Sequence, residues 1–148
     1  NQKLFKLRET LLFKLSKIYK FANYTNYLDD SIKKDNIELV SLGPPEDKKG
    51  YILPNTILLA IAKNTGKPFC KIEFKKFLDS KNMIVSIGSA CLTKSDKASP
   101  VLSAIGAPPV IKRGVIRISF GDSNTIEEIN KFIKVFCLGI EKQCTDLK

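Results

Sequence analysis

The residues with the clearest chemical potential are Gly88-Ser89-Ala90-Cys91, three small residues followed by a single cysteine. They follow the short apolar segment 83–85 and precede a polar, proline-punctuated stretch over 92–100. This pattern predicts a thiol on a permissive loop after a strand, where its sulfur is exposed and mobile. A deprotonated thiol in such a place is a nucleophile. The alternative is a small buried side chain, because free cysteine is among the most buried residue types.

The overall composition is typical of one globular domain. The chain has 148 residues, of which 43% are hydrophobic and 27% charged, so a substantial core is expected. No apolar run approaches the ~20 residues that a membrane-spanning helix needs, and the first residues lack a signal-peptide pattern. We therefore predict a single domain over 1–148 with no membrane partner.

The four cysteines, Cys70, Cys91, Cys137 and Cys144, are not spaced as metal ligands, and the chain contains no histidine. A zinc site is therefore not expected. A disulfide framework is not expected either, since the chain is large enough for a core and lacks a secretory signal. This pattern favours a reducing, cytoplasmic compartment, with Cys70 and Cys137 as packing residues.

The net charge is +10, from 25 basic and 15 acidic residues. A basic surface attracts nucleic acid or anionic lipid. The lysines are dispersed along the chain, however, and no nucleic-acid motif accompanies them. Nucleic acid is therefore a possible partner that the pattern does not favour.

Hydrophobic spacing predicts helices at both ends of the chain. Leucines recur at helical intervals over 3–20, and Thr125-Ile126-Glu127-Glu128 has the form of a capping box that opens a last helix. A shorter helix is predicted over 69–79. Another is predicted to begin at Ser99-Pro100 and to end at Gly106.

Four strands are predicted between these helices, and 22–36 is predicted to be a loop. The strands cover 37–42, 57–62, 84–87 and 114–120. Strands interleaved with helices indicate an α/β or α+β fold, in which one sheet is covered by helices.

Three segments, in this order and spacing, resemble the C-terminal domain of the cysteine desulfurases, pyridoxal-phosphate enzymes of the class V aminotransferase family. The segments are Leu53-Pro54-Asn55-Thr56, then Val85 to Cys91 with Ser99-Pro100-Val101-Leu102, then Val115 to Gly121 with Asn124 to Ile129. The resemblance implies the small domain of the fold type I pyridoxal-phosphate transferases, with a mixed, mostly antiparallel sheet. It divides the chain into a linking helix over 1–22 and a small α/β domain over 37–142.

The resemblance also implies roles for individual residues. Cys91, on the active-site loop formed with Gly88, Ser89 and Ala90, would attack the sulfur of substrate L-cysteine and become a persulfide. The products would be L-alanine and sulfur for iron–sulfur clusters or thiolated RNA. Arg117 would hold the substrate carboxylate, because a planar fork of donors suits a planar anion. Asn55 is assigned to substrate binding, or else it turns or caps the backbone.

The residues that hold pyridoxal phosphate belong, in this family, to a large domain that would precede Asn1. These 148 residues alone are therefore not expected to be active, and a start at Asn1 rather than Met favours an excised piece. The full-length enzyme is expected to be a homodimer that delivers sulfur to an acceptor or scaffold protein. The first helix, normally packed on the large domain, is expected to be partly exposed or to self-associate.

Two other functions are compatible with the sequence. One is an inactive remnant that keeps the fold and acts as a basic module binding protein or nucleic acid. The other is a related pyridoxal-phosphate enzyme, such as a selenocysteine lyase or an aminotransferase-like protein.

Overall fold

The computed structural model describes residues 2–23, 37–43, 53–64, 66–87 and 107–145. Its centre is a sheet of four strands in the order β1-β2-β3-β4. The strands are β1 (Lys20–Asn23), β2 (Ile37–Ser41), β3 (Thr56–Lys63) and β4 (Val115–Ser119). β1 pairs with β2 in parallel, whereas the β2–β3 and β3–β4 pairs are antiparallel. The predicted mixed, mostly antiparallel sheet is confirmed.

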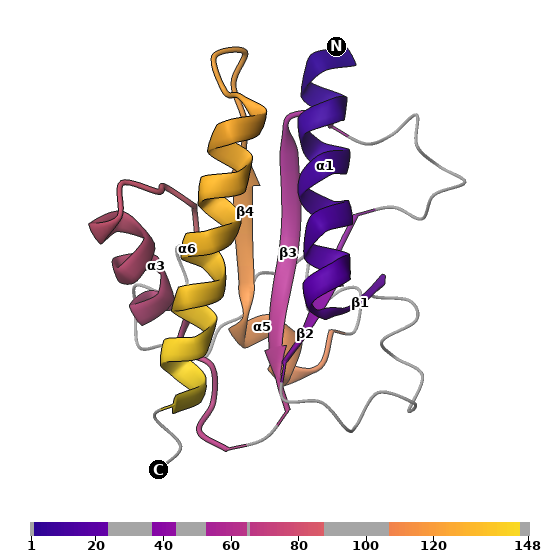
Figure 1. Cartoon of the computed structure of the whole chain (residues 1–148). Helices are drawn as coiled ribbons and strands as arrows, with labels where there is room; N and C mark the ends of the chain where they lie inside the picture. Colours follow the sequence, from indigo (N-terminus) through magenta and orange to yellow (C-terminus); the bar gives the residue numbers. More distant parts are fainter. Residues whose placement is uncertain (1, 24–36, 44–52, 65, 88–106, 146–148) are drawn as a thin grey trace.

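Helices cover both faces of this sheet (Figure 1). They are α1 (Gln2–Ile18), α3 (Lys71–Ser80), α5 (Pro109–Arg113) and α6 (Ile126–Thr145). The two long helices, α1 and α6, lie side by side over one face, and α3 packs against α6. The short α5 packs on β3 from the other face. The predicted α+β class is therefore confirmed.

Alternation along β3 decides what each face of the sheet can pack against. Ile57, Leu59 and Ile61 belong to the core shared with α1, α3 and α6. Ala60 and Ala62 belong to a smaller cluster with α5. Successive side chains of a strand point to opposite faces, so the bulky branched residues meet the long helices and the alanines meet the short one.

The turn between α5 and β4 passes very close to β3. The amide of Ile61 donates a hydrogen bond to the carbonyl of Gly114 at 2.9 Å. A β-carbon at Gly114 would lie 1.9 Å from the carbonyl oxygen of Ile61. Glycine is therefore required here by close approach of two backbones.

The first helix is part of the core of this chain. Leu7, Leu11 and Leu15, spaced four residues apart, are at most 2% exposed. Lys14 donates a hydrogen bond to the side chain of Asn130 on α6. The leucine stripe is covered by α6 and the sheet, whereas Phe13 and Ile18 of the same helix are 62% and 51% exposed, so the expected partial exposure is confirmed for these two residues only. Self-association stays a prediction.

The N-terminus of α6 carries the predicted capping box. The backbone amide of Glu128 donates to Oγ1 of Thr125 at 3.2 Å, and the amide of Thr125 donates to Oε2 of Glu128 at 3.0 Å. Asn124 donates to the same carboxylate oxygen at 2.9 Å. The box thus satisfies amides that the first helical turn leaves without partners.

These hydrogen bonds make a pH-dependent contribution to stability. The side chain of Asn124 and then the amide of Thr125 lower the pKa of Glu128 below its ordinary value of 4.5. A lowered pKa in the folded state stabilises the fold above the unfolded-state pKa, and this stabilisation is lost as the pH falls through the folded value. Thermal melts of Glu128→Gln should show a lower Tm than the unsubstituted chain at pH 7. The gap should narrow as the pH falls below 4.5, the ordinary pKa of the group, and a gap that is constant with pH would contradict this role.

The structure departs from the sequence-based prediction at two predicted elements and one that was not predicted. The segment 22–36 was expected to be a loop from its start, but Lys20–Asn23 forms β1, because β2 supplies hydrogen-bond partners that the local sequence does not reveal. The predicted strand 84–87 is wrong, since Ser86 makes only an isolated bridge to Arg117. Helix α5 was missed, although Pro108-Pro109 is a helix-start signal. The helix predicted from Ser99 to Gly106 lies outside the described residues.

Candidate functional site

Arg117 lies in the middle of β4, on the face of the sheet opposite α1 and α6. Its neighbours Ile116 and Ile118 point into the core shared with these helices, so alternation places Arg117 on the other face, where it is exposed. Leu58 of β3 stands directly opposite and is 36% exposed. Among the described residues, no carboxylate forms an ion pair with Arg117. In this part of the chain the arginine is therefore not the partner of a surface carboxylate.

On its other side Arg117 faces Ser86. The amide of Arg117 donates to the carbonyl of Ser86 at 2.8 Å, and the amide of Ser86 donates to the carbonyl of Arg117 at 3.0 Å. Such a reciprocal pair places two side chains on the same face of a sheet. The segment that leads to the predicted active-site loop is thus attached to the sheet at the predicted substrate arginine. Sequence reasoning missed Ser86, whose only signal is its place five residues before Cys91.

Asn55 lies in the turn that enters β3. Its carbonyl accepts a hydrogen bond from the amide of Phe120 at 2.8 Å, and its side-chain oxygen accepts one from Oγ1 of Thr56 at 3.5 Å. These contacts order the entry to the strand. The structure records no contact between the side chains of Asn55 and Arg117, and substrate binding by Asn55 stays a prediction.

The predicted loop of Gly88, Ser89, Ala90 and Cys91 lies outside the described residues. The described part of the candidate site therefore consists of Arg117 and its two cross-strand neighbours on the sheet, Ser86 and Leu58. The nucleophilic role of Cys91 stays a prediction.

A buried arginine connects α1 to the start of β3, one residue beyond Asn55. Arg8 is 5% exposed, and its Nη1 donates to the carbonyl of Thr56 at 2.6 Å. Burial lowers the pKa of its guanidinium, and the nearby Glu9 opposes that shift. Arg8 thus fixes the strand entry from the helix side, and sequence reasoning missed it because arginine is mostly an exposed residue type.

A second polar junction lies at the far end of β3. The buried Lys63 donates from Nζ to the carbonyl of Gln143 on α6 at 3.0 Å. The side chain of Gln143 donates to the carbonyl of Cys70 at 2.7 Å and accepts from its amide at 2.9 Å. The glutamine therefore secures the start of α3, and Cys70 serves there through its backbone.

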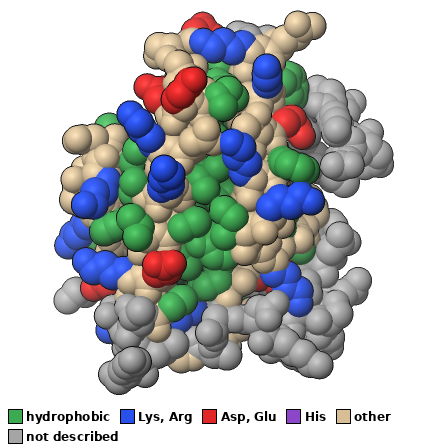
Figure 2. All heavy atoms as spheres, in the orientation of Figure 1, with side chains coloured by type: hydrophobic (Ala, Val, Ile, Leu, Met, Phe, Trp, Pro, Cys, Tyr) green, Lys and Arg blue, Asp and Glu red, His purple; other side chains and the backbone are tan. Residues whose placement is uncertain are grey.

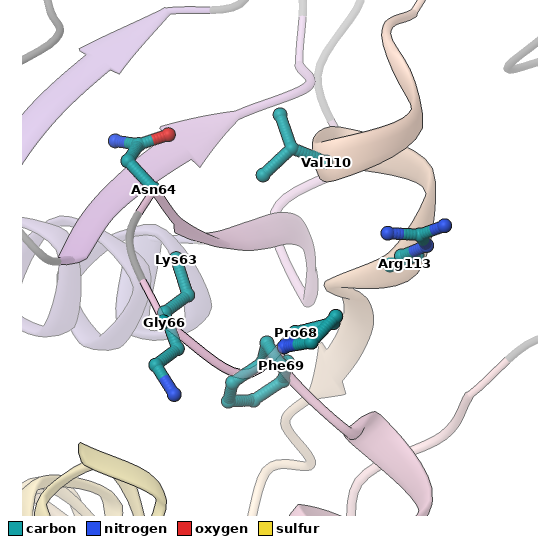
Figure 3. A pocket seen from close by; sticks show the side chains of 7 residues that line it. All are labelled: Lys63, Asn64, Gly66, Pro68, Phe69, Val110 and Arg113. Carbon is teal, nitrogen blue, oxygen red and sulfur yellow. The ribbon is translucent and has the colours of Figure 1, made fainter. Parts of the chain in front are cut away.

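A cavity of about 270 Å³ lies beside this junction, lined by Lys63, Asn64, Gly66, Pro68, Phe69, Val110 and Arg113 (Figure 3). It includes neither Asn55 nor Arg117. The ammonium of Lys63 is already engaged by a helix carbonyl, so it does not converge with Arg113 on a common point. This cavity is separate from the predicted substrate site.

The cysteines of α6 pack against the core. Cys137 and Cys144 are partly buried against it, and Cys70, Cys137 and Cys144 are free thiols. Burial, followed by a hydrogen bond with Cys137, raises the pKa of Tyr19. The packing role predicted for Cys137 is confirmed.

Three further features of the described residues bear on partners. No described helix combines the length and the apolar character that crossing a membrane requires. Nowhere in the described ranges do three or more potential metal ligands gather. Figure 2 shows Lys and Arg side chains scattered among apolar and acidic ones over α1 and α6, without a continuous basic stripe.

Comparison with solved structures shows the same arrangement of sheet and helices in NifS-like proteins. The X-ray structure of a NifS-like protein from Rickettsia africae ESF-5 has a TM-score of 0.58 and 26% identity, over 94% of this chain and 28% of that protein. A second NifS-like structure, 23% identical with a TM-score of 0.55, supports the fold. No known family model matches the chain.

By sequence the chain is similar to part of several cysteine desulfurases. It is 36% identical over 78 residues to the cysteine desulfurase IscS of Methanosarcina thermophila, which is 51% of this chain and 19% of that protein. It is 30% identical over 125 residues to the IscS of Dictyoglomus turgidum, which is 84% of this chain and 29% of that protein. The chain thus spans less than a third of these relatives. These findings confirm the resemblance predicted from the motifs and are consistent with a C-terminal fragment of such an enzyme.

Proposed function

We propose that this chain is the small C-terminal domain of a pyridoxal-phosphate-dependent cysteine desulfurase. The observation that carries this proposal is the guanidinium of Arg117, exposed on the sheet and without an ion-pair partner among the described residues. An exposed arginine beside the segment that leads to Cys91 supplies a carboxylate-binding group where the reaction needs one. The similarity to cysteine desulfurases supports the class of reaction.

In the proposed reaction the thiolate of Cys91 attacks the sulfur of bound L-cysteine. A bond forms between the two sulfur atoms while the carbon–sulfur bond of the substrate breaks. The substrate carbon keeps the bonding electron pair and takes up a proton, giving L-alanine. Cys91 is left as a persulfide, so atoms and electrons balance without an external oxidant.

Arg117 would hold the carboxylate of the substrate during this attack, and Asn55 would help to fix the substrate from the entry of β3. Cys91 is five positions after Ser86 in the sequence, and five steps of extended chain span at most about 18 Å. Anchoring Ser86 on Arg117 therefore bounds the distance between the proposed nucleophile and the proposed carboxylate site.

Pyridoxal phosphate would be held mainly by a large domain that this chain does not contain. When bound, that cofactor withdraws electrons from the substrate and so labilises its carbon–sulfur bond. None of the described residues is assigned to it, so the contribution of this chain is carboxylate binding and sulfur transfer. A homodimer, a sulfur acceptor or scaffold protein and a cytoplasmic location belong to the same proposal.

The test is alanine release from cysteine by the gene product that carries this chain. Cys91→Ala should lower the rate on the order of a thousandfold or more, because the nucleophile is lost. Arg117→Lys should lower kcat/KM roughly 10- to 100-fold, mainly through KM, because a bidentate hydrogen bond to a charged group is lost.

Two variants serve as matched controls, Cys144→Ala for the thiol and Arg113→Lys for the guanidinium, and both should keep full activity. Alanine release that survives Cys91→Ala would overturn the proposal. Binding of nucleic acid that weakens steeply with salt, in a protein without turnover, would instead support the binding module.

A further inference from the structure

We propose that Ser86 is a second substrate-binding residue, whose hydroxyl donates a hydrogen bond to the carboxylate that Arg117 holds. This inference rests on the proposed function, because it assigns a further residue to the same site. It starts from the reciprocal backbone hydrogen bonds between Ser86 and Arg117, at 2.8 and 3.0 Å.

The pairing fixes where the two side chains lie. In an antiparallel pair that exchanges both hydrogen bonds, the α-carbons are about 5.5 Å apart and the side chains project from the same face. Ser86 is half-buried and Arg117 is exposed on that face. Ser86 and Leu58 therefore flank the arginine from opposite sides.

The chemistry of these two neighbours differs. Leu58 offers only apolar surface, whereas a serine hydroxyl is a hydrogen-bond donor. A carboxylate has about four lone-pair sites, and a bidentate guanidinium uses two of them. A ligand carboxylate on Arg117 therefore has acceptor sites left, and Ser86 is, within the described part of the chain, the cross-strand neighbour able to donate to them.

The other strand hydroxyls on the same face, counting only residues that the structure describes, are farther from the arginine. Ser119 lies two residues along β4 and pairs with Thr56 of β3. Positions two residues apart on a strand are separated by nearly 7 Å. Ser119 is thus a matched control, since it is an exposed serine on the same strand face that does not oppose Arg117.

The first experiment measures carboxylate binding by NMR in the native protein, with Arg117 Nε–H and the Ser86 amide as probes. L-alanine is the ligand, and ethylamine, which is alanine without its carboxylate, is the control ligand. Ser86→Ala should weaken alanine binding about tenfold, the order expected for a hydrogen bond to a charged group. Ser86→Thr should retain most of the affinity, and Ser119→Ala should retain all of it.

Ethylamine should move neither probe in any variant. Equal alanine affinity in the unsubstituted protein and in Ser86→Ala would overturn the inference. So would an equal loss in Ser119→Ala, because the effect would then not depend on the position beside Arg117. Absence of any alanine response at Arg117 would overturn it as well.

Turnover of cysteine by the same variants separates this inference from the proposed function. Ser86→Ala should raise KM about tenfold and leave kcat nearly unchanged, because the lost hydrogen bond is to a group that does not react. If Cys91→Ala abolishes turnover but Ser86→Ala leaves KM unchanged, the proposed function holds and the role of Ser86 fails. If alanine binding depends on Ser86 but no turnover occurs, the binding role holds and the desulfurase fails.

Discussion

Gly114→Ala should lower the free energy of unfolding by roughly 3 kcal/mol or more, the upper range for forcing an extra group into a packed site. The added β-carbon would lie 1.9 Å from the carbonyl oxygen of Ile61 and 2.8 Å from its carbonyl carbon. These are backbone atoms of the central strand, so no side-chain rotation relieves the clash. The turn would have to move away, breaking the hydrogen bond from the Ile61 amide to the Gly114 carbonyl.

Urea denaturation of the purified chain measures this effect through the midpoint of unfolding. Gly121→Ala is the matched control, because a β-carbon there would meet only the side-chain oxygen of Asn124, at 3.9 Å. That control should change the free energy of unfolding by less than about 0.5 kcal/mol. A Gly114→Ala chain as stable as the control would show that the turn is not held against β3.

Phe136→Ala should destabilise the fold by about 3–5 kcal/mol, the range for truncating a buried phenylalanine. Phe136 is fully buried. Its ring centroid lies 5.3 Å from the ring centroid of Phe74 and 5.9 Å from that of Phe132. It also packs edge-on against Tyr19, with the ring centroids 6.2 Å apart. Its removal opens a cavity where α3, α6 and the end of α1 meet.

The same denaturation experiment tests this prediction with two companion variants. Phe136→Leu keeps most of the volume and should cost clearly less than the alanine variant. Phe13→Ala removes a ring that is 62% exposed and should have little effect. Equal losses for Phe13→Ala and Phe136→Ala would contradict the burial of this cluster.

Local patterns predicted the elements whose signals lie within their own sequence. The capping box at Thr125 and Glu128 marked the start of α6, because both partners lie within one helical turn. The continuous apolar run over 57–62 marked β3, because the strand is covered on both faces.

Two details that local patterns did not reveal, the strand β1 and the contact that secures the start of α3, depend on partners distant in the sequence. β1 exists because β2 offers it a parallel register, from Lys20 against Glu38 onward. The start of α3 is secured by Gln143, which lies 73 residues away along the chain from Cys70. No local propensity records such contacts, since they arise only when the chain is folded.

The same limit applies to the candidate site. The motif order pointed to Arg117, but it did not reveal that Ser86 meets the arginine through its backbone. The strand predicted over 84–87 has β-branched residues suited to a full ladder. The structure pairs only its middle with β4, so the segment is attached at one point.

This single attachment gives β4 two kinds of backbone amide. The amides of Ile116 and Ile118 face β3 within the continuous β3–β4 ladder, whereas that of Arg117 faces Ser86 alone. Opening one isolated bridge costs far less than opening a continuous ladder. Neighbouring amides along β4 therefore belong to different cooperative units. The amide of Arg117 belongs to a unit that opens locally, and the amides of Ile116 and Ile118 belong to one that opens only when the domain unfolds.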